Sequence, residues 1–108
     1  MTDKIVVLVT CGSPEEGRKI ARALVERRVA ACVNIVPGIE SVYRWKDAVE
    51  EASECLLLAK TTRGQFAPLE SAVRELHSYE LPEIVALPLI DGLDSYLNWI
   101  SASVESVE

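Results

Sequence analysis

The sequence predicts an α+β protein with a ferredoxin-like fold: βαβ-βαβ order, one antiparallel sheet, a long central hairpin and a C-terminal helix. Three observations lead to this prediction. An apolar strand segment precedes a well-capped helix, residues 31–62 have the pattern of one long hairpin, and a second helix and strand follow before a last helix. In such a fold the helices pack on one face of the sheet.

The first predicted strand is Lys4–Cys11. Its uninterrupted IVVLV run is typical of a central strand covered on both faces. A helix start follows, because the Ser13 hydroxyl can accept a backbone hydrogen bond, Pro14 suits the first helical position and Glu16 completes a capping box. We expect this helix to end near Arg27 and to bury Ile20, Ala21 and Leu24.

The predicted hairpin begins with the alternating stretch Ala31–Lys46, whose odd positions are mostly apolar, as in a half-buried strand. The segment Pro37–Gly38 interrupts this pattern without changing its phase. A polar turn at Lys46-Asp47-Ala48 then leads to a second strand-like run, Ser53–Thr62. Both arms are longer than the usual strand of about six residues. The surplus should project and pair with another chain, which predicts an oligomer.

The second half begins with Thr62 and Gln65, which resemble another capped helix start, although Pro68 allows the regular helix to begin only near Ala67. We expect this helix to end near His77. A strand follows at Glu83–Leu89, then a break, then a helix over Leu93–Ala102 that buries Tyr96, Leu97 and Ile100. In this topology the end of the first strand and the start of the fourth share one end of the sheet. Cys11 and the segment His77–Glu83 should therefore lie close together.

Composition narrows the function classes. The chain of 108 residues is expected to form one domain, residues 1–108, with a net charge of −6 and no basic stripe, so neither nucleic acid nor a membrane is an expected partner. Its three cysteines are an odd number without CxxC spacing, and the N-terminus lacks the layout of a signal peptide, so we expect a cytoplasmic protein with reduced thiols. Catalytic signatures such as a P-loop, GxSxG or HExxH are absent, and we predict that the protein is not an enzyme.

Long stretches of the chain carry a family resemblance: ALVERRVAACVNIVPGIESVYRWK, LLLAKTT, LHSYELPEIVALPLIDG and YLNWI. Together they resemble the divalent-cation tolerance protein CutA family from Val6 to Ile100. The resemblance implies a homotrimer of ferredoxin-like subunits, similar in shape to the PII signalling proteins. It also implies a role in tolerance to copper and other divalent cations, with copper binding in some members.

Two departures from the family pattern stand out. Asp47 replaces the usual turn glycine, a substitution that the turn should tolerate. Ser78 stands where the family often has proline, and Leu76 precedes His77 where some members carry a second histidine. If paired histidines hold metal in those members, this chain has lost one ligand.

Candidate metal ligands are Cys11, His77 and Glu83, for copper or another divalent cation. Cys11 matches the family's cysteine and precedes a helix N-terminus, which would stabilise a soft thiolate ligand. The alternatives are that Cys11 is a small buried hydrophobe and that His77 only caps the end of its helix. Ligands from several subunits could also combine. We expect Cys32 and Cys55 to be packing residues.

An intersubunit pocket is a further possibility. Aromatic residues in the family motifs could line it, although subunit packing is favoured for them. The candidate pocket residues are Tyr43, Trp45, Lys60, Tyr79 and Trp99; Arg44, Lys46 and Lys60 could bind an anion there or be solvated strand ends. Alternative functions are therefore a PII-like signalling trimer that binds a small metabolite in the intersubunit cleft, or a scaffold for partner proteins.

Overall fold

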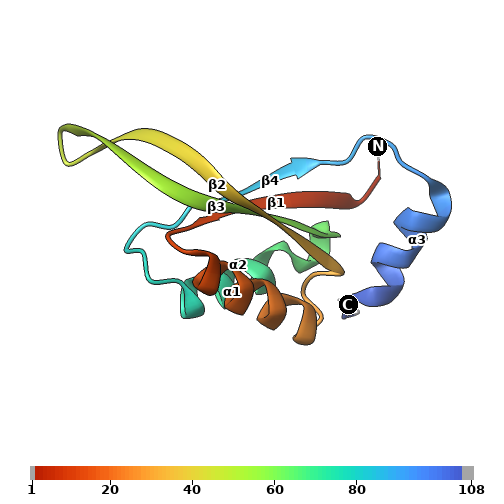
Figure 1. Cartoon of the computed structure of the whole chain (residues 1–108). Helices are drawn as coiled ribbons and strands as arrows, with labels where there is room; N and C mark the ends of the chain where they lie inside the picture. The colour runs from red at the N-terminus through yellow and green to blue at the C-terminus, as the bar shows by residue number, and fades with distance from the viewer. Residues whose placement is uncertain (1, 106–108) are drawn as a thin grey trace.

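A computed structural model describes residues 2–105, with the predicted order of elements (Figure 1). The elements are β1 (Lys4–Cys11), α1 (Pro14–Glu26), β2 (Cys32–Trp45), β3 (Ala48–Thr62), a 3₁₀ turn (Arg63–Gln65), α2 (Phe66–Leu76), β4 (Ile84–Pro88) and α3 (Asp94–Ser103). The four strands form one antiparallel sheet in the order β2-β3-β1-β4. The predicted ferredoxin-like fold is confirmed.

Helices α1 and α2 cover one face of this sheet, and the core lies between these helices and the sheet (Figure 1). The predicted inward residues of α1, Ile20, Ala21 and Leu24, are all buried. Helix α3 packs at the end of the sheet, where Leu97 and Ile100 cluster with Ala31. The prediction for Tyr96 is wrong: its side chain is 39% exposed, because α3 does not lie under the sheet.

The helix starts agree only in part with the predicted capping. Ser13 Oγ accepts from the Glu16 backbone N–H at 3.2 Å, as expected. The Glu16 carboxylate, however, accepts from the Ser78 backbone N–H at 2.8 Å, so the expected capping box gives way to a tertiary contact. At the second start, Thr62 makes no side-chain cap, and the buried Gln65 side chain donates to the Glu105 carbonyl. The 3₁₀ turn therefore replaces the capped start, and α2 begins at Phe66.

The hairpin is longer than predicted, because β3 begins at Ala48 and not at Ser53. Ala48 pairs with Trp45, so the turn has two residues, Lys46 and Asp47, with φ of 50° and 66°. This geometry is typical of a type I′ turn, and it confirms that Asp47 can replace glycine. Strand β1 pairs only with residues Cys55–Thr62 of β3, so the distal part of the hairpin is a two-stranded ribbon beyond the sheet (Figure 1). The described chain is therefore elongated, 44 by 25 by 22 Å.

A β-bulge at Pro37–Gly38, with φ of 70° at the glycine, changes which face the side chains of β2 occupy. Before it, Ile35 lies opposite the buried Leu57; beyond it, Ile39 lies opposite Glu54. Because opposed residues share a face and successive residues alternate, the odd positions move to the other side of the sheet. The expectation of an unchanged phase is wrong in space, although the sequence pattern continues.

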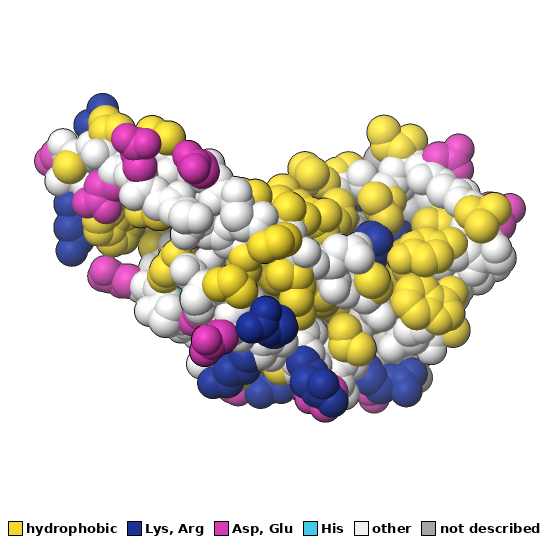
Figure 2. Space-filling view, in the orientation of Figure 1, with side chains coloured by type: hydrophobic (Ala, Val, Ile, Leu, Met, Phe, Trp, Pro, Cys, Tyr) yellow, Lys and Arg dark blue, Asp and Glu magenta, His cyan; other side chains and the backbone are white. Residues whose placement is uncertain are grey.

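The sheet face without helices is apolar. It carries Val6, Leu8, Val36, Leu56, Leu58, Val85 and Leu87, which oppose one another in the strand register. Hydrophobic side chains gather in the hollow between the hairpin and α3 (Figure 2). Strand β1 is central, as predicted, but within the described chain helices cover one of its faces and leave the other half-exposed. The expectation that both faces of this strand are covered is therefore not met within residues 2–105.

Candidate functional site

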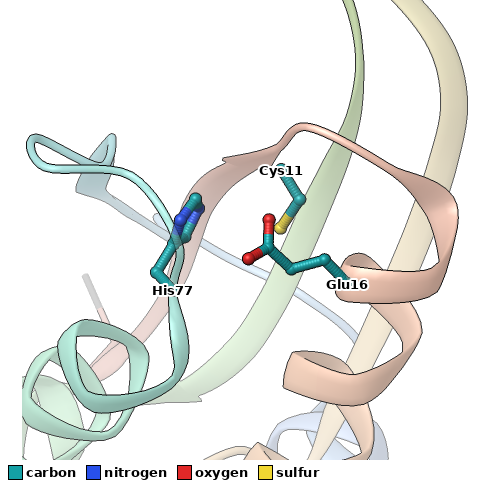
Figure 3. A group of neighbouring side chains, drawn as sticks. All are labelled: Cys11, Glu16 and His77. Carbon is teal, nitrogen blue, oxygen red and sulfur yellow. The ribbon is translucent and has the colours of Figure 1, made fainter.

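Three potential metal ligands converge at the end of β1: Cys11, Glu16 in the first turn of α1, and His77 directly after α2. Their ligand atoms all lie within 4.8 Å of one another, and the Cys11 sulfur points toward the Glu16 carboxylate beside the imidazole (Figure 3). The expected proximity of Cys11 and His77 is confirmed. The carboxylate of this cluster belongs to Glu16; Glu83 is exposed and lines a neighbouring pocket.

The His77 ring is held by two hydrogen bonds. Its Nε2 lies 2.7 Å from the Thr10 carbonyl oxygen, and its Nδ1 accepts from the Tyr79 backbone N–H at 3.1 Å. Because a carbonyl can only accept, Nε2 carries the proton and Nδ1 offers its lone pair to Tyr79. His77 is also the C-cap residue of α2, but its ring bonds to β1 and not to the last helical carbonyls.

The Cys11 thiol is fully buried. Burial, followed by the neighbouring Cys55 thiol and the Glu16 carboxylate, raises the pKa of Cys11 to about 12. The thiol is therefore protonated and inert at neutral pH. The expectation that the helix N-terminus stabilises a Cys11 thiolate is wrong in the absence of an ion, because desolvation and the negative charge nearby outweigh the helix dipole.

Glu16 is ionised and anchored. Burial opposes its charge, but hydrogen bonds from Ser78, the nearby His77 and the Gly12 backbone together lower the pKa of Glu16 below its ordinary value. Sequence reasoning missed Glu16 as a site residue because its position in a capping signature assigned it to its own helix. Its carboxylate instead accepts from Ser78, which is distant in sequence, and lies beside Cys11 and His77.

The three groups suit a thiophilic or borderline ion in position and in chemistry. A thiol, an imidazole and a carboxylate form a mixed donor set of the kind that late first-row metals accept. Each donor is already engaged, however: the sulfur by its proton, Nδ1 by Tyr79 and the carboxylate by Ser78. An ion that binds here must displace the thiol proton and the Tyr79 N–H, whereas the carboxylate keeps lone pairs besides the one that Ser78 uses.

A pocket of about 790 Å³ lies between the distal hairpin and the segment 79–83. Three of the predicted pocket residues, Tyr43, Trp45 and Tyr79, line it. The Tyr79 hydroxyl donates to Glu54 Oε2 at 2.6 Å. Burial, then the Glu54 hydrogen bond and charge, raise the pKa of Tyr79 above its ordinary value. The phenol therefore stays protonated and links the start of the 79–83 segment to the ribbon.

The other predicted pocket residues, Lys60 and Trp99, lie elsewhere. Lys60 Nζ donates to Asn34 at 2.7 Å and lies 5.7 Å from the Tyr96 ring centroid. The Trp99 and Tyr96 ring centroids are 5.4 Å apart, with the rings tilted by 35°. The pocket itself contains Arg44 among its charged residues, but four carboxylates surround it: Glu50, Glu54, Glu80 and Glu83. This charge balance disfavours the anion that the sequence allowed.

Comparison with known proteins gives a consistent result. Residues 5–103 match the family described as CutA1 divalent ion tolerance protein. The divalent-cation tolerance protein CutA of Thermus thermophilus is 56% identical over 95 residues, which cover 88% of this chain and 92% of that protein. The chloroplastic protein CutA of Arabidopsis thaliana is 47% identical over 102 residues, and this chain spans only 56% of its length.

Solved structures agree with these relatives. The Thermus thermophilus divalent cation tolerance protein superposes with a TM-score of 0.93 at 52% identity, over 94% of this chain and 99% of that one. A periplasmic divalent cation tolerance protein CutA from Archaeoglobus fulgidus has a TM-score of 0.91 at 39% identity, covering 94% and 99%. The PII-like protein CutA from Nostoc has a TM-score of 0.87 at 34% identity, covering 94% and 97%. Among residues 2–105, no helix has the length and apolar character needed to cross a membrane.

Proposed function

Because the chain belongs to the CutA1 divalent ion tolerance family, we propose that it serves metal tolerance by binding copper or another divalent cation at Cys11, Glu16 and His77. One observation carries the proposal: three donors from separate elements converge within 4.8 Å. Glu16 takes the place of Glu83 as the carboxylate ligand. The role is binding or response, without catalysis.

Binding at this site is coupled to protons. A metal–sulfur bond requires the thiolate, and the pKa of Cys11 is about 12, so each bound ion releases the thiol proton. The apparent affinity should therefore rise about tenfold for each pH unit between pH 6 and 8. His77 must also break its bond with the Tyr79 backbone to offer Nδ1.

Calorimetric titration of Cu(II) and Zn(II) into the reduced protein, at two pH values, tests this proposal. Cys11→Ser, Glu16→Gln and His77→Gln should each weaken binding by more than about tenfold, since each removes a donor. Glu83→Gln is the matched control, because it neutralises a carboxylate outside the cluster, and it should leave affinity unchanged. Wild-type affinity in all three cluster variants, or binding no tighter than millimolar in wild type, would remove the site.

We also propose a homotrimer in the cytoplasm. The apolar helix-free face of the sheet and the projecting ribbon support association, since exposed strand edges and apolar sheet faces are covered in stable proteins. The three cysteines are free, which is consistent with a reducing compartment. The Archaeoglobus relative carries the description periplasmic, so fractionation of cells that express the tagged protein is the direct test. Recovery in a periplasmic or membrane fraction would contradict a cytoplasmic location.

The pocket favours a second candidate function. A PII-like signalling trimer would bind a small metabolite, and the PII-like description of the Nostoc relative together with the pocket of about 790 Å³ supports this alternative. The four glutamates and three aromatic rings favour a positively charged organic ligand. Thermal-shift screening of organic cations and anions distinguishes the two functions, because a true ligand raises the melting temperature by mass action. A uniformly negative screen would count against signalling.

A further inference from the structure

Cys11 has a second thiol as its neighbour. Cys11 and Cys55 lie directly opposite each other in the antiparallel pair of β1 and β3. Both side chains face the helices, with 0% and 2% of their surface exposed. They meet beneath Gly17 of α1, where a Cβ added to the glycine would lie 2.6 Å from Cys55 Sγ and 4.0 Å from Cys11 Cβ. Sequence reasoning gave Cys55 only a packing role.

The spacing of this thiol pair suits one small soft ion. Directly opposed residues of an antiparallel pair have Cβ atoms about 4.5–5.5 Å apart. An ion held linearly between two thiolates separates the sulfurs by roughly 4.6 Å, taking the zinc–thiolate bond of about 2.3 Å as a guide, and this lies within that Cβ range. A soft monovalent ion such as Cu(I) selects thiolates over oxygen and nitrogen donors. Two thiolates more than neutralise its single positive charge, so the occupied pair carries a net charge of −1.

The other side chains that could bind the ion, His77 and Glu16, make stronger hydrogen bonds than Cys55 does. The His77 ring has two hydrogen bonds and would lose the one from Tyr79 on offering Nδ1 to an ion, and Glu16 is held by a charge-assisted hydrogen bond from Ser78. Cys55 makes one weak bond, from its S–H to the Ser13 carbonyl at 3.4 Å. Weak thiol donors lose little when they are replaced by a metal bond. The third cysteine, Cys32, is half-exposed on β2 and lies opposite Lys60, outside this pair.

We propose that Cys11 and Cys55 together form a two-thiolate site for Cu(I). This site shares Cys11 with the divalent site of Cys11, Glu16 and His77. The chemistry is an exchange without redox change: Cu⁺ joins two sulfurs, two thiol protons leave to water, and the site gains one net negative charge. The inference rests on the proposed metal role and refines it. The same Cys11 sulfur would serve Cu(I) with Cys55, or a divalent ion with Glu16 and His77, but not both at once.

Anaerobic competition for Cu(I) against a chromophoric Cu(I) chelator tests the site in the reduced full-length protein. Wild type and the control Cys32→Ser should each retain one Cu(I) per chain. Cys55→Ser and Cys11→Ser should lose more than about 100-fold in affinity, beyond the range for an outer-shell contact. His77→Gln should keep Cu(I) within about threefold while losing divalent ions. Unchanged Cu(I) affinity in Cys55→Ser would overturn the two-thiolate site.

Two further outcomes separate this inference from the proposed function. If Cys55→Ser does not fold, the copper X-ray absorption spectrum of wild type decides: two sulfur neighbours are expected, and one sulfur with nitrogen or oxygen neighbours would refute the pair. If Cu(II) and Zn(II) bind as proposed but Cu(I) does not depend on Cys55, only the further inference fails. If no tested metal binds wild type, the proposed function fails as well.

Discussion

Gly17→Ala should destabilise the protein, although alanine is the better helix former. Gly17 lies inside α1 against the sheet, and an added Cβ would stand 2.6 Å from Cys55 Sγ and 3.5 Å from Leu57 Cδ2. Ordinary non-bonded contacts between heavy atoms lie near 3.5–4.0 Å, so the new methyl is roughly 1 Å too close to the sulfur. Cys55 is fully packed and cannot move aside without shifting its neighbours.

The expected magnitude follows from two opposing effects. Helix propensity favours alanine over glycine by about 1 kcal/mol. Overpacking a core costs about 1–3 kcal/mol, and a contact as close as this one belongs at the upper end of that range. We therefore expect a net loss of about 1–2 kcal/mol in the free energy of unfolding, measured by urea denaturation at one fixed protomer concentration.

A double-mutant cycle identifies the cause. Cys55→Ala removes the sulfur, so Gly17→Ala placed on that background should become neutral or stabilising, with a coupling energy of about 2–3 kcal/mol. Gly38→Ala is the matched control: nothing lies within 4 Å of its added Cβ, and its cost should come from a φ of 70° alone and not depend on Cys55. A stabilised Gly17→Ala variant, or one that Cys55→Ala does not rescue, would refute the packing argument.

Three further predictions concern the subunit interface and the titrating groups. Leu8→Asp on the helix-free sheet face should give monomers by light scattering, whereas Val25→Asp on the exposed side of α1 should not change the mass; identical masses would exclude this face as the interface. The raised pKa of Tyr79 arises from burial and then from Glu54, so the stability it contributes is present below about pH 10 and is lost as the pH rises further. Tyr79→Phe should lack this alkaline decline, and parallel profiles of the two proteins would contradict the assignment. Burial raises the pKa of Glu16, but the hydrogen bonds from Ser78, the nearby His77 ring and the Gly12 backbone lower it by more, so its contribution is present above pH 4.5 and is lost as the pH falls below that value. Glu16→Gln should flatten this acid limb of the stability curve, and an unchanged limb would assign the acid sensitivity to other groups.

Much of the fold was predictable because its signals are local. Each of these signals depends on residues that are close together in the sequence: the alternation in the hairpin arms, the apolar run of β1 and the Ser13-Pro14 helix start. The family motifs then supplied the expectation of a trimer. The prediction failed where local patterns compete with tertiary contacts: Glu16 left its capping box for Ser78, and Gln65 bonded to Glu105 in place of capping a helix.

The sequence by itself determined the order of the elements, the presence of a long hairpin and the topological proximity of Cys11 to His77. Only the tertiary structure decided that Glu16 completes that cluster and that Cys55 lies opposite Cys11 beneath Gly17. It also decided that, beyond the bulge, the odd-numbered side chains of β2 lie on the other face of the sheet. The physical reason is that strand register and helix docking set which side chains meet, and both are fixed by packing over the whole sheet, which no local pattern encodes.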